Sequence, residues 1–599
     1  MYLKSFFNDL NITNDDRFYL CILLAFSLLI TFVMISFHQT RGALNSDIYV
    51  YLAGALDVAN MNYNHISSPI WIQNSPVIIF LTSLLFRLGL VDINAMFIVT
   101  GCFGILGIFG MYTFLKIRFS PLISLTGAIL YNSLSLTLFY YANAMLDTSA
   151  VAMIIWTLIF TVAAVNKNSK YFILVSLSFV LTFFTRFTTA FIISLIILYI
   201  LKDHDIINLF ESLFYNKSIF KKKIISFFKS HEFKWILISA LLGIAFFAII
   251  CVWLLQYGQL SYFSMAQGSI GRYTNPTDPQ FITSRYFFLK NFLNLLSANS
   301  ISFNPIEQFN EPSILSYLIV VIGSIGILLK ILSIFKNRKI IKANYKTLEF
   351  RNKYSRVILG IFCVFLIIIG VIGFKVNYLI TLVCFWIMFL IVMSLVREYP
   401  VNMDNSTLYI MCFGLFAFYF VIVSYIDLKC VRYILPAFPG FVYMVIYSLN
   451  YIVEFINNGF QYETLHLNLT SSNKKFAHDA KWFISRAIPV VLIIICLFFA
   501  FNFTNTVDHN EDDLDRVELC DFIKEYDPDY QSKEFLCMWD LRYFEWYLNK
   551  DIIKYREDVN EIDPDRYDYV ITFNKTFDYD NYRLVHHEGN YYLNEKISY

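Results

Sequence analysis

The sequence predicts a polytopic α-helical membrane protein with about 13 transmembrane helices and a small soluble α/β domain at its C-terminal end. Of the 599 residues, 57% are hydrophobic and only 15% are charged, and the mean hydropathy is +0.56. Ordinary soluble domains carry about 25% charged residues. The charge is also unevenly placed, because 24 of the 45 Asp and Glu residues fall within 507–599.

Long apolar stretches define the expected membrane helices. A crossing needs roughly 17–25 mostly apolar residues. The polar segment 1–17 lacks the short apolar core and cleavage site of a signal peptide, so we interpret the stretch that follows as a retained helix. The expected spans are 17-38, 94-115, 119-138, 146-165, 169-185, 187-201, 235-256, 313-335, 356-374, 377-396, 406-426, 433-455 and 486-505.

The basic residues in the connecting loops predict the orientation. The loops 202–234 and 336–355 each contain seven Lys or Arg residues, whereas 39–93 has only Arg41 and Arg87. Cytoplasmic loops carry an excess of Lys and Arg. The N-terminus is therefore expected in the cytoplasm of a plasma-membrane protein, and the loops 39-93 and 257-312 are expected outside.

The first external loop is too long for a simple connector. Its apolar spacing predicts two helices lying at the membrane surface, Ile48 to Ala59 and Pro76 to Leu90. Long ordered loops between helices are usually functional. We expect 1-506 to form the catalytic membrane domain, with 257-312 as its second large external loop.

The last segment, 507-599, is expected to be an external soluble α/β domain. It mixes short strand-like runs with amphipathic helix-like stretches, and its acidity disfavours a place against anionic cytoplasmic lipid headgroups. Cys520 and Cys537 both lie here, and their spacing leaves open whether they pair. No CxxC motif suggests a zinc site.

Two isolated acids are the candidate catalytic residues. Asp47 follows the first span, and Asp147 opens the fourth. Each has a structural alternative, because an acid in the first turn of a helix satisfies backbone N–H groups and complements the helix dipole. A carboxylate at the edge of the hydrocarbon region is costly without a partner, which favours a functional role. The pair could deprotonate an attacking hydroxyl or share a divalent metal ion.

A cationic cluster lies on the same predicted face. It consists of Lys429, Arg432 and Tyr433, which precede the twelfth span. Basic residues are unexpected on this external face, because Lys and Arg are normally enriched in cytoplasmic loops. Their presence favours an anionic ligand such as phosphate. The alternative is a basic pair that extends to the interface at a helix end. Arg186, between two apolar runs, could pair with Asp147 or with the phosphate, or be a simple turn residue.

Together these motifs resemble the GT-C superfamily of membrane glycosyltransferases, in particular the protein O-mannosyltransferase and aminoarabinose transferase-like branch (GT39/GT83-like). The first loop carries an acid within Ser-Asp-Ile-Tyr at 46–49, the second acid ends Asn-Ala-Met-Leu-Asp at 143–147, and the run from 429 to 440 is similar to the R-Y-x-x-P-x-x-P segment of many members. Two departures stand out. The paired acids that relatives often carry in the first loop are reduced to one here, and the W-W-D-Y-G signature of oligosaccharyltransferases is absent.

The resemblance implies transfer of a sugar from a polyprenyl-phosphate donor to an acceptor protein, lipid or glycan at the external membrane face. It implies Asp47 as base or acceptor-orienting carboxylate, assisted by Asp147, with Lys429 and Arg432 on the donor phosphate. Membrane lipids are the expected surroundings, and no nucleic-acid partner is expected. The metal, the sugar and the acceptor are left open.

Two other classes of function compete with a transferase. A transporter or flippase of a lipid-linked or anionic substrate would show inverted repeats and charges near the bilayer midplane. We find no repeat, and the charges gather at one face. A scaffold of an envelope complex would tolerate replacement of Asp47 and Asp147.

Overall fold

The structure is a computed structural model of the 599-residue chain. It describes residues 9–41, 47–61, 69–201, 217–258, 260, 284–299, 311–336, 353–397, 403–426, 429–466, 471–506, 511–538, 541–550, 552–554, 566–574, 577 and 580–597. Most of the predicted loop 257-312 lies outside these residues. So do parts of the two lysine-rich loops, 202–216 and 337–352.

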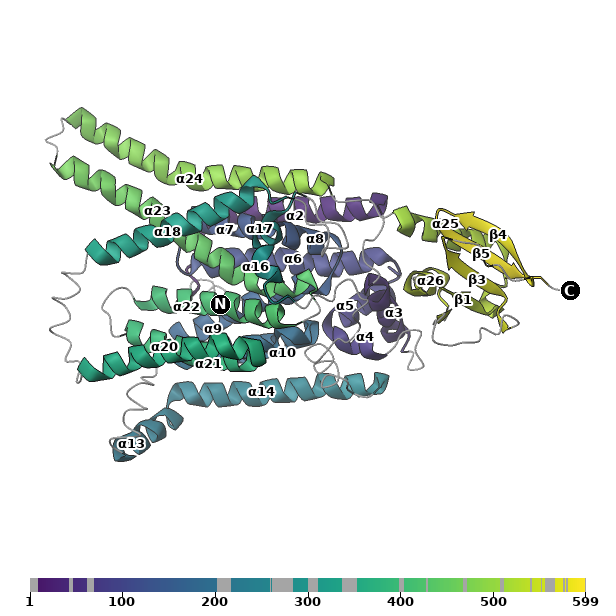
Figure 1. Ribbon diagram of the computed structural model, residues 1–599, viewed down its shortest axis with the longest axis horizontal. Helices are drawn as coiled ribbons and strands as arrows, with labels where there is room; N and C mark the ends of the chain where they lie inside the picture. The colour runs from purple at the N-terminus through teal and green to yellow at the C-terminus, as the bar shows by residue number, and fades with distance from the viewer. Residues whose placement is uncertain are drawn as a thin grey trace.

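Long helices make up the membrane portion of the chain. Figure 1 shows them running roughly along one direction, with a small sheet-containing unit at one end of the bundle. Their bounds, with the short helices between them, are η1 Asn14–Asp16, α2 Arg17–Arg41, α3 Asp47–Asn60, α4 Pro69–Asn74, α5 Pro76–Arg87, α6 Ile93–Lys116, α7 Pro121–Ser133, α8 Ser135–Ala142, α9 Leu146–Asn166, η2 Ser169–Tyr171, α10 Phe172–Thr185, η3 Phe187–Phe191, α11 Ile192–Ile200, α13 Lys217–Phe228, α14 His231–Leu254, η5 Leu255–Tyr257, α16 Phe287–Lys290, α17 Phe292–Ser297, α18 Ile314–Lys336, α20 Lys353–Val376, α21 Tyr378–Arg397, α22 Met403–Tyr425, η6 Val431–Ala437, α23 Phe438–His466 and α24 Ser471–Thr506.

Eight of the described helices are long and apolar enough to cross a membrane, and a ninth candidate is the bent pair α7 and α8. The bend is 64°. Four further predicted spans correspond to shorter apolar helices, at 169–185, 187–200, 360–374 and 378–393. The chain is thus a polytopic helical membrane protein. The predicted number of about 13 counts these shorter helices as crossings, which length and composition alone do not establish.

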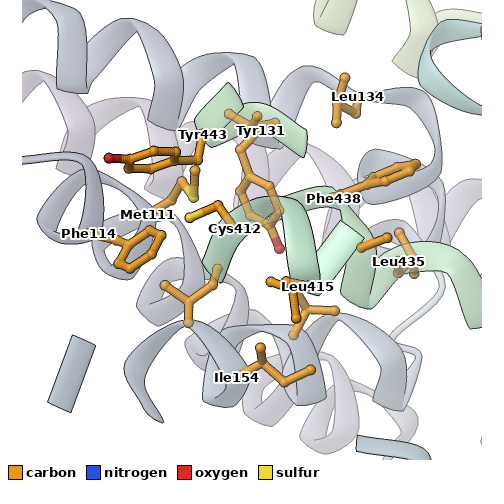
Figure 2. Packing of buried hydrophobic residues seen from close by; sticks show 14 of the residues in the cluster. Met111, Phe114, Tyr131, Leu134, Ile154, Cys412, Leu415, Leu435, Phe438 and Tyr443 are labelled. Atoms are coloured by element: carbon orange, nitrogen blue, oxygen red, sulfur yellow. The ribbon is translucent and has the colours of Figure 1, made fainter. Parts of the chain in front are cut away.

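The core lies where five elements of the bundle meet. Figure 2 shows buried side chains of α6, α7, α9, α22 and the η6–α23 segment packed together, among them Tyr131, Cys412 and Phe438. Gly440 lets two of these helices approach closely. A β-carbon at Gly440 would lie 2.3 Å from the carbonyl oxygen of Cys412. This contact fixes α23, and with it the preceding η6 segment, against α22.

A small domain with a five-stranded sheet ends the chain, as the sequence predicts. The strand order is β2-β1-β3-β5-β4, with β1 parallel to β2 and β3 and the remaining pairs antiparallel. Cys520 and Cys537 are both buried in its core. Its elements are α25 Glu511–Tyr526, η7 Tyr530–Ser532, β1 Phe535–Cys537, α26 Leu541–Leu548, β2 Ile553–Lys554, β3 Tyr569–Phe573, β4 Tyr582–Glu588 and β5 Tyr591–Lys596.

The first loop contains helices where the sequence predicts them. α3 and α5 form a compact unit with α4, and Figure 1 places this unit between the bundle and the C-terminal domain. The side chain of Arg87, at the end of α5, donates hydrogen bonds to the carbonyl oxygens of Val58 and Ala59, at 3.0 and 3.1 Å. Those carbonyls belong to the last turn of α3, where a cation is favourable. The two helices are therefore tied together at the end remote from Asp47.

Candidate active site

Asp47 is the first residue of α3, and its carboxylate bridges two arginines. Oδ2 accepts a hydrogen bond from Nη1 of Arg432 at 2.8 Å, and Oδ1 accepts one from Nη1 of Arg542 at 3.1 Å. An acid in the first turn complements the helix dipole, so part of the capping interpretation holds. The two charged partners show that Asp47 also belongs to an ionic cluster.

Asp147 occupies the second position of α9 and is 2% exposed. Its Oδ2 accepts a hydrogen bond from Nη1 of Arg186 at 2.7 Å. The chain enters α9 through a tight turn in which Ala144 has a φ of 48°, a conformation that non-glycine residues seldom adopt. A buried charge needs such a partner, because the cost of removing it from water is otherwise not offset.

Arg186 lies at the break between α10 and η3, in extended backbone with a φ of −161°. It does more than turn the chain, because it carries the ion pair with Asp147. Its guanidinium carbon lies 5.2 Å from the ring centroid of Tyr433, and that of Arg432 lies 5.9 Å from the same ring. Tyr433 thus contacts both arginines, and the two ion pairs form one cluster.

Lys429 is placed differently from the other predicted phosphate ligands. Its side chain is fully buried, and Nζ donates hydrogen bonds to the carbonyl oxygens of Ser424, at 2.8 Å, and of Ile426. These carbonyls belong to the C-terminal end of α22 and the residue after it. A cation there satisfies backbone acceptors and complements the helix dipole. In this structure Lys429 caps α22 and stabilises the backbone that leads to Arg432.

The cluster carries a surplus of positive charge. Among the described residues it joins three arginines, Arg186, Arg432 and Arg542, to the two carboxylates. Nε of Arg432 is buried and has no hydrogen-bond acceptor among the described residues. A buried guanidinium N–H without an acceptor is costly. An added anion would supply both the missing acceptor and the missing charge.

The cations also act on the ionisation of Asp47. Burial raises the pKa of its carboxyl group, but the nearby charges of Arg432, Arg542 and Arg186 outweigh burial and hold the pKa below its ordinary value. Tyr51 lies on the same helix. Burial and the neighbouring Asp47 raise the pKa of its phenol, so the hydroxyl stays protonated. The site therefore holds a carboxylate and a neutral phenol side by side on α3.

Arg542 is the site residue that the sequence did not reveal. It lies 495 positions from Asp47, on α26 of the C-terminal domain. The run that contains it, Met-Trp-Asp-Leu-Arg at 538–542, bears only a superficial likeness to the W-W-D-Y-G signature of oligosaccharyltransferases. No local pattern signals a contact between elements so far apart, because it depends on how the domain packs against α3.

The donor atoms of this cluster do not fit a metal ion. Among the described residues, no group of three or more His, Cys, Asp or Glu side chains comes together as a metal site requires. Both oxygens of Asp47 and Oδ2 of Asp147 accept hydrogen bonds from arginines. The two carboxylates are therefore arranged for ion pairing.

Comparisons with known proteins agree with this architecture. Residues 73–216 match the protein family described as dolichyl-phosphate-mannose-protein mannosyltransferase, a segment that includes Asp147 and Arg186. The crystal structure of ArnT from Cupriavidus metallidurans bound to undecaprenyl phosphate is similar, with a TM-score of 0.53 and 10% identity, over 97% of this chain and 98% of that chain. The structure of ArnT from the same organism in the apo state gives a TM-score of 0.49 at 10% identity, over the same shares. No curated protein matches the chain in sequence.

The family match over residues 73–216 and the shared fold confirm the resemblance predicted from the sequence, which is to polytopic membrane glycosyltransferases of the GT-C type. Within that class, the family match is to the mannosyltransferases and the fold is that of ArnT. These are the two groups that the sequence motifs resemble.

Proposed function

We propose that the protein transfers a sugar from a polyprenyl-phosphate donor to an acceptor at the external face of the membrane. The observation that carries this proposal is the convergence of Asp47 and Asp147 with three arginines, Arg186, Arg432 and Arg542, in one cluster with surplus positive charge. The similar ArnT was crystallised with undecaprenyl phosphate, and a lipid phosphate is the kind of anion that this cluster suits.

Arg432 is the proposed principal ligand of the donor phosphate. Its Nε–H is available to donate a hydrogen bond to a phosphate oxygen, and the guanidinium fork matches phosphate geometry. Arg186 contacts the same Tyr433 ring and can add a second charge. Lys429 was also predicted to bind the phosphate. Its engagement with the end of α22 favours an indirect role, in which it holds the backbone that presents Arg432.

Asp47 is the proposed base. The acceptor hydroxyl would attack the anomeric carbon, the bond from that carbon to the phosphate oxygen would break, and the hydroxyl proton would pass to Asp47. The leaving phosphate would keep the bonding electrons, and the arginines would stabilise its charge. Attack from the side opposite the phosphate gives inversion. When Arg432 turns to the phosphate, its positive charge is shared between the phosphate and Asp47. The pKa of Asp47 then rises, so its carboxylate becomes a stronger base.

The proposed topology has thirteen crossings, the N-terminus in the cytoplasm and the C-terminal domain outside. Figure 1 supports this orientation, because the lysine-containing α13 lies at the end of the bundle opposite the C-terminal domain. Asp47 and Arg542 are at the domain end. Nucleotide sugars are absent outside the cell, so an external enzyme needs a lipid to carry its activated sugar.

The test is glycosyl transfer by the purified protein in lipid, with radiolabelled polyprenyl-phosphate sugars and a crude envelope acceptor. Transfer by the wild type should fall by about a hundredfold or more in Asp47→Asn, which keeps its shape but cannot accept the proton. Arg432→Ala should lose both donor binding and transfer. A cooperative melting transition well above the assay temperature would show that the variants fold.

Two outcomes would contradict the proposal. Unimpaired transfer by Asp47→Asn would remove the catalytic role of the carboxylate. Binding of the lipid without any transfer by the wild type would favour the alternative function, a transporter or flippase of a lipid-linked or anionic substrate.

A further inference from the structure

The C-terminal domain is docked on the candidate active site through one helix. α26 presents Tyr543, Trp546 and Tyr547 to the α3–α5 unit, while Phe544 and Leu548 pack into the domain's own core. The ring of Trp546 stacks on Phe86 of α5 with centroids 5.9 Å apart. A helix of eight residues thus contributes aromatic side chains to two cores, which fixes its position relative to α3.

Buried polar contacts hold the same interface. The hydroxyl of Tyr49 on α3 donates to the carboxylate of Asp513 on α25, at 2.9 and 3.0 Å to its two oxygens, and lies 2.8 Å from the hydroxyl of Tyr547. Asp513 is 2% exposed and Tyr49 is fully buried. Hydrogen bonds to a buried charged group are directional and expensive to lose. The domain is therefore seated in one orientation.

This orientation delivers Arg542 to Asp47. Tyr49 is two residues from Asp47 and Tyr543 follows Arg542, and the rings of Tyr49 and Tyr543 are 4.5 Å apart. The seat of the domain and the ion pair are thus adjacent parts of one interface. The Arg542 side chain is 38% exposed, whereas that of Arg432 is 17% exposed. The membrane domain supplies the enclosed partner of Asp47, and the C-terminal domain supplies the outer one.

We propose that Arg542 is a positioning residue for sugar transfer, and that the C-terminal domain thereby forms part of the active site. Arg542 holds one oxygen of Asp47 while Arg432 turns to the donor phosphate, so the carboxylate keeps its direction toward the acceptor hydroxyl. Without Arg542, Asp47 would lose the hydrogen bond at Oδ1 while donor binding draws Arg432 away from Oδ2. The expected effect on kcat rests on the proposed function, whereas the contact between Arg542 and Asp47 does not.

The kinetic test compares Arg542→Gln, Arg542→Lys and Arg583→Gln in full-length protein in lipid, using undecaprenyl-phosphate sugar as donor. Arg583 is the matched control, because it is an exposed arginine of the same domain that pairs with a carboxylate, Glu595, at 2.8 Å. Arg542→Gln should lower kcat about tenfold, since small misplacement of a reacting group is costly, and change KM for the donor less than twofold. Arg542→Lys should recover most of the rate, and Arg583→Gln should match wild type.

Two kinetic results would overturn the proposal. One is wild-type kcat in Arg542→Gln. The other is a rise in KM for the donor with kcat unchanged, which would make Arg542 a donor ligand. A drop in kcat shared by Arg583→Gln would show a general effect of charge on the domain and would also count against it.

A second measurement needs no turnover. Melting temperatures of Asp47→Asn, Arg542→Gln and the double variant should be non-additive, because the two side chains contact each other. Strictly additive shifts would contradict the contact whether or not the protein transfers sugar. If the wild type transfers none, the proposed function fails while this cycle still reports on the pair.

Discussion

At the scale of single residues, the site is governed by the cost of holding charge away from water. Asp147 is 2% exposed and has Arg186 at 2.7 Å. Asp47 is 16% exposed at its side chain and has two arginines. Each carboxylate has a guanidinium within hydrogen-bond distance, and this partner offsets part of the cost of desolvation. With Arg542, the same pairs give the proposed site a surplus of positive charge.

The pH dependence of stability tests the state of Asp47. Its pKa in the folded protein lies below the ordinary value, which is about 3.9 for an unfolded aspartate. A lowered pKa contributes stability that is fully present above about pH 4 and is lost as the pH falls through the folded value. We therefore expect the free energy of unfolding at pH 7 to be about 1–2 kcal/mol higher for wild type than for Asp47→Asn, with a correspondingly higher melting temperature. This difference should persist down to about pH 4.

The measurement is the melting temperature of both proteins in the same lipid from pH 7 to pH 3. Their curves should converge only at the acid end. Convergence already between pH 7 and pH 5 would mean that burial dominates and that Asp47 takes up a proton near neutrality.

At the scale of elements, breaks between helices position the site. Arg186 lies between α10 and η3, and Arg432 lies in η6, just before α23. Asp147 follows the turn at Ala144. Irregular backbone at membrane depth is tolerated where it lines a site or is covered by protein. Regular helices pack around these breaks and set their relative positions.

Gly440→Ala tests whether helix packing sets the position of Arg432. The new methyl group would collide with the Cys412 carbonyl oxygen and push α23 away from α22. We expect a loss of about 2–3 kcal/mol in the free energy of unfolding, with a fall in donor affinity because η6 moves with α23.

The control is Gly323→Ala on α18, where a β-carbon would meet nothing within 4 Å. It should leave melting temperature and donor binding unchanged within error. Equal effects of the two substitutions would show that the close approach of α22 and α23 is unimportant for the site.

At the scale of the whole molecule, the C-terminal domain is a structural partner of the membrane domain. Its contact with α3 combines aromatic packing with the buried Tyr49–Asp513 hydrogen bonds. Burial and the charge of Asp513 raise the pKa of the Tyr49 phenol well above its ordinary value. Tyr49 therefore remains a donor at any physiological pH.

Tyr49→Phe should loosen the domain. It removes a hydrogen bond to a buried carboxylate, so we expect a loss of about 1–3 kcal/mol and faster hydrogen exchange in α26. Transfer should fall in parallel with Arg542→Gln, because Arg542 is carried by the same helix.

Tyr526→Phe is the matched control within the same domain, because its hydroxyl donates to Glu595 at 3.1 Å but the residue is 41% exposed. Its effect should stay within about 0.5 kcal/mol. If Tyr49→Phe is equally mild and α26 exchanges at the wild-type rate, the domain is not seated through Tyr49.

Much of the candidate site could be predicted because charged residues are conspicuous among the apolar residues of membrane segments. Asp147 and Arg432 stand out in apolar surroundings, and both lie in the cluster. Lys429 stands out for the same reason, yet its ammonium caps α22. Composition cannot separate these roles, since a buried cation needs a partner in either case and only packing decides which partner it meets.

The membrane class, the helices of the first loop, the C-terminal sheet domain and the resemblance to GT-C enzymes all follow from the amino-acid sequence alone. Hydrophobic length, charge bias and short motifs are local properties that the chain carries before it folds. The folded chain adds that Arg186 pairs with Asp147, that Asp47 contacts both Arg432 and Arg542, and that α26 docks on α3. Those contacts join residues 39, 385 and 495 positions apart. They depend on how distant elements pack together, which local sequence patterns do not predict.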